Sequence, residues 1–351
     1  MQVDTSSARR SIASEAISFE VKIKGKPAIV PALRVGDQTI IVTGKWLKVA
    51  SVHDEEWLDA SVLKHPEQYL ASIRTANLRA DIFTFAQKLP QVEPQYPYYF
   101  EKDNVAAIRL TTFDDWWEKQ LPQESRKNVR RAGRRGVTVR SVELSDELIR
   151  GITAIYNESP IRQGVPFAHY GKGFDTVRRE TATLVERSEF LGAYHDNELI
   201  GFIKLVYMGD LGSILNIVAL NRHYDKRPAN ALIAKAVEVC LQKGKTHLLY
   251  GKYTYGNKTA SSLTEFKYRN GFEKILVPRY FIPLTAEGRM CVNLRLHRGL
   301  LGILPARLIT LLLALRSRCF EHAARRHGRA SQIEGSGTEP DVPKPEHESA
   351  T

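Results

Sequence analysis

Several side chains that can take part in chemistry fall in one predicted loop, residues 158–172 (ESPIRQGVPFAHYGK). Histidine is the usual general base near neutral pH, because its unperturbed pKa is about 6.5. We therefore consider His169, with Tyr170 and Glu158, as candidate catalytic residues beside a polar acceptor. The alternative is a surface loop with a structural histidine, anchored by Phe167 and Tyr170.

A second group of polar side chains accompanies predicted strands and a helix near the C-terminal end of the main body. Asn216 interrupts an otherwise apolar strand, where an amide must find a partner or face a cavity. Tyr255 and Asn257 end the next strand, although tyrosine is also common in strands. Lys267 follows in a short helix. It would offer a cation to a phosphate or an oxyanion, or it is a solvated helix residue.

The charge balance predicts an anionic partner. The chain has 51 Lys and Arg against 39 Asp and Glu, a formal net charge of +12. Phosphate, nucleic acid and acidic lipid all fit this excess. Apolar residues make up 43% of the chain, which excludes wholesale disorder and a polytopic membrane protein. The three scattered cysteines indicate a reducing compartment, and their spacing gives no reason to expect a metal.

Basic residues recur every four positions in residues 125–137, SRKNVRRAGRRGV. On a helix, Arg126, Arg130 and Arg134 would lie on one face, next to a second row of Lys127, Arg131 and Arg135. Like charges at this spacing repel, so a helix that keeps them is either a solvated face or a surface for an anionic partner.

The elements that must position these residues follow from hydrophobic periodicity. A hairpin is predicted around Gly36-Asp37, followed by a helical stretch at 54–89 and a strand at 105–110. The later helices are predicted at 125–136, 145–158, 174–187, 227–243 and 260–270, and the strands at 189–194, 198–208, 211–220, 246–256 and 272–284. We expect residues 189–284 to form one mixed sheet.

This order of elements resembles the GNAT superfamily of N-acetyltransferases. YRNGFEKI, residues 268–275, is similar to the final helix-to-strand junction of that family. The basic helix and the Phe266-Lys267 pair are similar to Fem-type aminoacyltransferases. Over residues 113–284 the resemblance implies an α/β (α+β) fold with a mixed, mostly antiparallel central sheet flanked by helices.

The remaining segments complete the expected organisation. We expect a flexible N-terminus at 1–18, a reduced N-terminal lobe at 19–112, an acyltransferase domain at 113–290, a C-terminal amphipathic helical segment at 291–327 and a disordered tail at 328–351. The N-terminus has no apolar run, so a cytoplasmic protein is expected. Leu300 to Leu315 is an apolar run flanked by arginines. It is either a helix in an anionic membrane surface or a helix docked on protein.

The resemblance also implies a reaction. The fold splays two strands, here residues 214–220 and 246–255, and the donor lies between them, near Asn216, Tyr255 and Asn257. Backbone N–H groups of the first strand, around Val218, would bind the oxyanion. The implied activity is acyl transfer, chiefly of acetyl, from acyl-CoA to an amino group of a small molecule or of a cell-envelope glycan precursor. The alternatives are an aminoacyl-tRNA-dependent transferase and a nonenzymatic nucleic-acid-binding protein.

The donor-binding loop departs from the family pattern. The family usually has a glycine-rich pyrophosphate loop before the long helix, but residues 221–232, NRHYDKRPANAL, contain no glycine. Arg222, Lys226 and Arg227 would have to bind the phosphates instead. Lys267 replaces the tyrosine that the family commonly has before its Gly-Phe pair, and Fem-type enzymes carry a lysine near this point.

Overall fold

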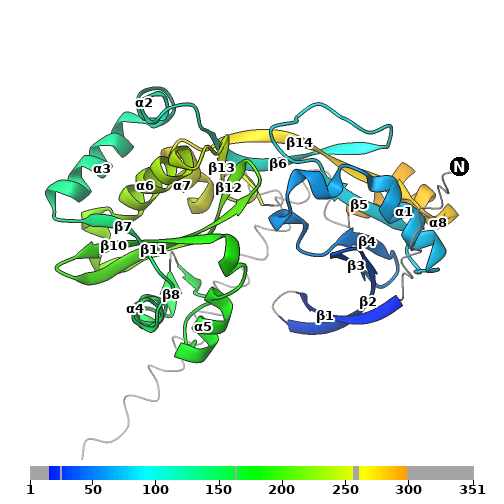
Figure 1. Cartoon of the computed structure of the whole chain (residues 1–351), viewed down its shortest axis with the longest axis horizontal. Coiled ribbons are helices and arrows are strands. Elements are labelled where there is room, and N and C mark those ends of the chain that lie inside the picture. The colour runs from blue at the N-terminus through cyan, green and yellow to red at the C-terminus, as the bar shows by residue number, and fades with distance from the viewer. Residues whose placement is uncertain (1–15, 24–25, 163, 256–260, 299–351) are drawn as a thin grey trace, which may run out of the picture. The chain divides into compact units, whose positions relative to one another are not determined.

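One large sheet runs through the chain in the computed structural model, which describes residues 16–23, 26–162, 164–255 and 261–298 (Figure 1). Within the described residues it has twelve strands, in the order β1-β2-β3-β4-β5-β14-β6-β13-β12-β11-β10-β7. Their bounds are β1 Ala16–Ile23, β2 Lys26–Val35, β3 Gln38–Thr43, β4 Val49–Val52, β5 Ile82–Ala86, β6 Phe100–Arg109, β7 Thr138–Val142, β10 Ser188–His195, β11 Glu198–Met208, β12 Leu211–Ala219, β13 His247–Leu249 and β14 Glu273–Pro283.

The sheet is mixed and mostly antiparallel, as expected. Among the described strands, β4 pairs with β5 and β12 pairs with β13 in parallel, and the other pairs in the sheet are antiparallel. A separate two-stranded ribbon consists of β8 (Ile161–Arg162) and β9 (Val165–Pro166). No helix of the described residues is long and apolar enough to span a bilayer.

Helices cover both faces of the sheet in its β6–β7 half. Figure 1 shows α3, α6 and α7 over one face, with α4 and α5 on the other. The helix bounds are α1 Pro66–Thr75, α2 Phe113–Asp115, α3 Gln123–Arg134, α4 Asp146–Asn157, α5 Phe174–Thr181, α6 Pro228–Gln242, α7 Ser262–Arg269 and α8 Ala286–Asn293. The side chain of Ser145 caps α4 by accepting a hydrogen bond from the Leu148 backbone N–H at 3.2 Å.

The predicted helical stretch at 54–89 is wrong for most of its length. It contains the ten-residue α1 and two short turns, Glu55–Trp57 and Ala60–Leu63, and its last part is β5. The β5 sequence IFTFA is a continuous apolar run, and Phe83 and Phe85 are fully buried. Periodicity cannot distinguish such a run in a central strand from a buried helix.

The expected sheet at 189–284 is part of a larger one. β14 pairs with β5 along one edge and with β6 along the other, so strands from the N-terminal part continue the same sheet. Two strands from before residue 189 also pair with strands of this region: β7 pairs with β10, and β6 pairs with β13. The predicted tail and the apolar run from Leu300 to Leu315 lie outside the described residues.

Candidate functional site

The strands β12 and β13 separate where the resemblance predicts a splay. They pair in parallel only from Leu211↔His247 to Ser213↔Leu249. Beyond Ser213, β12 has no described strand on that side. At the same level, Leu215 has no counterpart in β11, because Ile214 pairs with Leu205 and Asn216 with Lys204. A bulge therefore lies beside the point where the two strands part.

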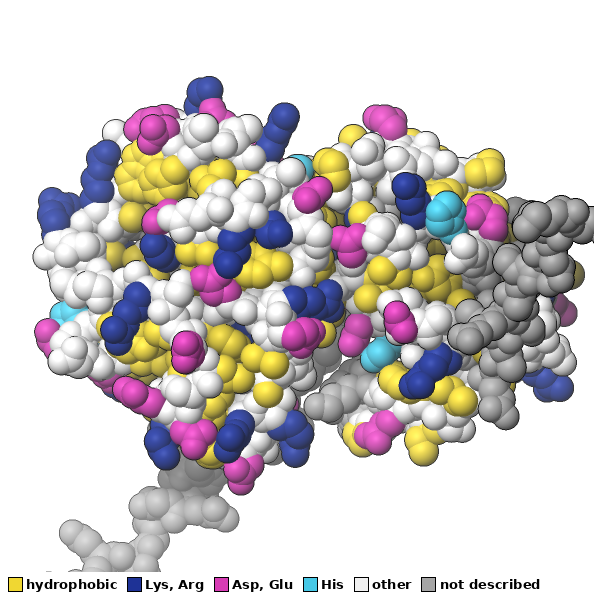
Figure 2. All heavy atoms as spheres, viewed as in Figure 1, with side chains coloured by type: hydrophobic (Ala, Val, Ile, Leu, Met, Phe, Trp, Pro, Cys, Tyr) yellow, Lys and Arg dark blue, Asp and Glu magenta, His cyan; other side chains and the backbone are white. Residues whose placement is uncertain are grey.

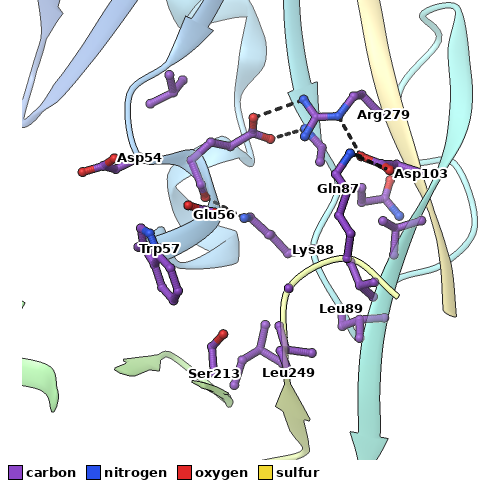
Figure 3. Close-up of a pocket in the computed structure, with 18 of the residues that line it drawn as sticks. Asp54, Glu56, Trp57, Gln87, Lys88, Leu89, Asp103, Ser213, Leu249 and Arg279 are labelled. Carbon is purple, nitrogen blue, oxygen red and sulfur yellow. Dashed lines mark hydrogen bonds and ion pairs between the residues drawn. The ribbon is translucent and has the colours of Figure 1, made fainter. Parts of the chain in front are cut away.

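A cavity of about 380 Å³ reaches this splay (Figure 3). Ser213 and Leu249, the last paired residues of the two strands, both line it. Its other lining residues include the apolar side chains Leu89, Val105, Leu211 and Val277, and the polar or aromatic side chains Asp54, Glu56, Trp57, Lys88, Asn104 and Lys252. The cavity thus combines an apolar surface with charged groups of both signs.

An ion-pair chain crosses one wall of the cavity (Figure 3). Arg279 lies 3.3 Å from the Glu55 carboxylate through Nη1 and 3.1 Å from the Asp103 carboxylate through Nε. Asp103 also accepts a hydrogen bond from Lys252 Nζ at 2.9 Å. Burial opposes ionisation of Asp103, but Lys252 and Arg279 outweigh it and hold its pKa below the usual value. This series of ion pairs connects β14, β6 and the residues after β13.

Lys88 is a second cation in the cavity wall. Its Nζ donates a hydrogen bond to the Glu55 backbone carbonyl at 2.6 Å. Burial lowers its pKa, while the negative charge of Glu55 acts in the opposite direction. Two carboxylates, Asp54 and Glu56, are exposed at the same cavity.

Lys267 is buried on the other side of the residues that follow β13. Its side chain is fully buried, and its Nζ donates a hydrogen bond to the Lys252 carbonyl at 2.5 Å. The ammonium lies 4.7 Å from the ring centroid of Tyr250 and 4.9 Å from that of Tyr255. Burial lowers the pKa of Lys267 to about 8. Lys252 therefore links the two groups: its carbonyl accepts a hydrogen bond from Lys267, and its ammonium pairs with Asp103 in the cavity wall.

Glu158 and Arg162, from the predicted polar loop, turn inward. The Glu158 carboxylate accepts hydrogen bonds from the backbone N–H groups of Asn221, at 2.7 Å, and Arg222, at 3.0 Å. It also pairs with Arg162 at 3.2 Å. Arg162 donates to the Ala219 carbonyl at 2.6 Å. These residues fix the end of β12 and the segment that follows it.

The other candidates in this loop do not face the cavity. His169 stacks on Tyr156, with ring centroids 4.4 Å apart, and its Nδ1 lies 3.0 Å from Lys172 Nζ. Burial and the Lys172 charge lower the pKa of His169. Tyr170 is 47% exposed, and the loop also exposes the apolar Ile161 and Val165. Neither His169, Tyr170 nor Glu158 lines the cavity.

The basic residues after β12 are engaged within the protein. Arg222 pairs with Glu198, and Lys226 lies 3.7 Å from Asp225. Arg227 lies over the Tyr224 ring at 4.8 Å and has a positive φ of 57°. The backbone N–H groups of the first two residues of this segment are already taken by Glu158.

The donor-side candidates lie along the splayed strand and near Lys267. Asn216 and Val218 are partly buried in β12. The register places Asn216 opposite Lys204 on one face of the sheet, and no hydrogen bond joins its side chain to another described residue. Tyr255 is half-exposed and contacts Lys267, whereas Asn257 lies outside the described residues.

The sequence reasoning missed the charged groups of the cavity. They come from the turn at Glu55, from Lys88 after β5, from β6 and from β14. The sequence did contain a signal, since Arg279 interrupts the apolar β14 sequence EKILVPRYFIP and Asp103 lies within β6. A charge inside a central strand needs a partner.

A comparison with solved structures identifies the fold of the chain. No family model matches the chain, and no curated protein matches it. FemX is 11% identical, covers 79% of this chain and 90% of its own, and has a TM-score of 0.54. The C-terminal domain of a putative lysylphosphatidylglycerol synthetase from Agrobacterium fabrum is 14% identical over 74% of this chain and 84% of its own, with a TM-score of 0.47. A tandem GNAT protein from the clavulanic acid biosynthesis pathway is 11% identical over 73% and 82%, with a TM-score of 0.38. Over most of its length the chain shares the fold of FemX.

Proposed function

We propose that this chain is a transferase that moves an acyl group from an activated donor to an amino group at the splay between β12 and β13. The observation that carries the proposal is that two features lie on either side of the residues that follow β13. The 380 Å³ cavity ends at the last paired residues of the splay, and the buried Lys267 is bonded to Lys252 in the cavity wall.

The reaction balances with Lys267 as a proton carrier. The amine nitrogen attacks the donor carbonyl, so that a C–N bond forms and negative charge develops on the carbonyl oxygen. Backbone N–H groups of β12 near the bulge are suited to hold this oxyanion. When the intermediate collapses, the bond to the leaving oxygen or sulfur breaks. Protonated Lys267 gives its proton to the leaving group and recovers one from the new ammonium. A pKa of about 8 suits both transfers.

The cavity is the proposed acceptor site. Its volume lies within the usual range of small-molecule sites. Carboxylates at Asp54 and Glu56 suit hydroxyl and amino groups, and Trp57 offers an aromatic face. This combination suits an amino sugar, such as the amine of a cell-envelope glycan precursor.

The donor is either an acyl-CoA, such as acetyl-CoA, or an aminoacyl-tRNA. The sequence resemblance to N-acetyltransferases supports the first. A specific observation favours the second: Glu158 occupies the N–H groups of Asn221 and Arg222, so a carboxylate stands where a pyrophosphate would bind. In addition, no ion pair joins Arg130, Arg131 or Arg134 on α3 to another described residue. Figure 2 shows Lys and Arg side chains along the edge where α3 lies.

A two-donor assay tests the proposal. The full chain is incubated with glucosamine and either acetyl-CoA or aminoacyl-tRNA, and release of CoA thiol or free tRNA is followed. We expect amine-dependent release with one donor, at a rate that Lys267→Met lowers roughly 100-fold or more. Lys235→Met, a partly exposed lysine on α6, is the matched control. Donor release that does not depend on the amine or on Lys267 would contradict the proposal.

A further inference from the structure

Large apolar side chains are exposed on two segments that lie far apart in the sequence. Trp46, in the loop between β3 and β4, is 70% exposed. Met290 and Leu294, on and just after α8, are 55% and 60% exposed. Single exposed apolar residues are ordinary, but a group of them rimmed by charge marks an interaction surface.

Asp81 brings these two segments together. On one side, the Lys48 N–H donates to the Asp81 carboxylate, and the Asp81 N–H donates to the Lys48 carbonyl, both at 2.8 Å. On the other side, Thr285 Oγ1 donates to the carboxylate at 3.0 Å, and the Leu284 N–H donates to the Asp81 carbonyl at 2.8 Å. The loop that carries Trp46 and the start of α8 are therefore both hydrogen-bonded to Asp81.

Basic side chains accompany the apolar ones. Lys45 precedes Trp46, Arg289 precedes Met290, and Arg79 lies two residues before Asp81; all three are exposed. Among the described residues, no carboxylate lies within ion-pair distance of any of them. Glu287 is the acidic residue of α8. We call Lys45, Trp46, Arg79, Arg289, Met290 and Leu294 the Trp46 patch.

We propose that the Trp46 patch docks the protein on an anionic lipid bilayer. Tryptophan prefers the level of the lipid headgroups, where its ring is half in apolar surroundings, and Lys and Arg bind anionic headgroups. The sequence after α8 continues with Arg295 and Arg298 and then the apolar run Leu300 to Leu315. A nucleic acid would use the basic groups but would leave Met290 and Leu294 without a role.

Vesicle binding by the full chain tests this proposal. Phosphatidylcholine vesicles, with and without phosphatidylglycerol, are floated with the protein, and the bound fraction is measured. We expect binding only with phosphatidylglycerol. Lys45→Glu with Arg289→Glu should weaken it by roughly tenfold or more, because about 1 kcal/mol per basic residue is lost. Trp46→Ser with Met290→Ser should weaken it by a similar factor through lost apolar burial.

Matched controls and a direct readout make the result decisive. Ile29→Ser and Tyr224→Ser remove side chains that are 77% and 70% exposed elsewhere, and both should bind like the wild type. Tryptophan fluorescence should shift to shorter wavelength on vesicle addition, and Trp46→Phe should abolish this shift. Absence of binding, equal binding by the patch variants, or a shift that persists in Trp46→Phe would overturn the proposal. So would loss of tRNA binding, and not of vesicle binding, in the charge variant.

Discussion

Two buried lysines show how similar residues reach different roles. Burial lowers the pKa of Lys204 and of Lys267 to about 8. Lys204 lies over the Phe190 ring, but it also donates to the carbonyl of Thr181, the last residue of α5, at 2.8 Å, and to the carbonyl and hydroxyl oxygens of Thr183. Lys267 has one carbonyl acceptor, from Lys252, and otherwise faces two tyrosine rings. An ammonium on aromatic faces keeps donors for another group, so Lys267 suits chemistry and Lys204 suits structure.

The pH dependence of the rate is the first prediction at this scale. If the protonated form of Lys267 acts on the leaving group, the rate should fall as the pH rises through about 8. Lys267→Arg keeps the charge but cannot release its proton, so it should lower the rate at every pH and remove this alkaline limb. The measurement is a pH–rate profile of both proteins.

The free energy of unfolding should rise over the same pH interval in which the rate falls. The lowered pKa means that folded protein binds fewer protons than unfolded protein between about 8 and the ordinary value of 10.5. Stability therefore rises with pH over this interval. A loss of rate that follows loss of fold over the same interval would contradict the assignment.

At the scale of the element, α8 depends on a close approach of backbones. A Cβ at Gly288 would lie 1.9 Å from the Asp81 carbonyl oxygen, a separation that no side chain tolerates. We predict that Gly288→Ala displaces α8 and lowers the free energy of unfolding by about 1–3 kcal/mol. Denaturant titration measures this effect.

Gly173→Ala is the matched control for α8. A Cβ at Gly173 would meet nothing within 4 Å, and its φ of −78° suits alanine. This control should stay within about 0.5 kcal/mol of the wild type. Equal denaturation midpoints for Gly288→Ala and Gly173→Ala would contradict the prediction, because they would mean that α8 accommodates the added methyl group without loss of stability.

Elements with local signals were predictable from the sequence. Strands β10, β11 and β12 are joined by the turns at Asp196-Asn197 and Gly209-Asp210, and Ser145 begins α4 as a capping residue. The insertion of β14 between β5 and β6 has no local signal, because it depends on pairing across most of the chain. The site divides in the same way. Lys267 belongs to a recognisable local motif, whereas the cavity forms only when distant segments meet.

At the scale of the whole molecule, Arg279 binds partners 224 and 176 residues away in sequence, Glu55 and Asp103. We predict that Arg279→Met lowers the free energy of unfolding by about 3–5 kcal/mol at neutral pH, because it leaves Glu55 without its ion-pair partner and leaves Asp103 with Lys252 alone. Denaturant titration at neutral and acidic pH measures this loss.

The loss of unfolding free energy in Arg279→Met should become smaller at acidic pH. The lowered pKa of Asp103 gives stability that is present above its ordinary value of 3.8 and disappears as the pH falls through the folded value. The wild type and the variant should therefore converge at low pH. Arg269→Met removes an exposed pair with Glu265 and should cost under about 1 kcal/mol at every pH. A constant difference across pH would contradict the role assigned to Arg279.

The position of β14 also affects how the chain is synthesised. Ribosomes deliver the chain from its N-terminus, so β5 and β6 emerge long before Glu273–Pro283, the strand that pairs with both. Until then the nascent chain carries two strands, the apolar β5 and the more polar β6, whose shared neighbour does not yet exist. Open strand edges of this kind attract other chains. A premature stop before residue 273 would therefore yield an aggregation-prone fragment rather than a smaller folded protein.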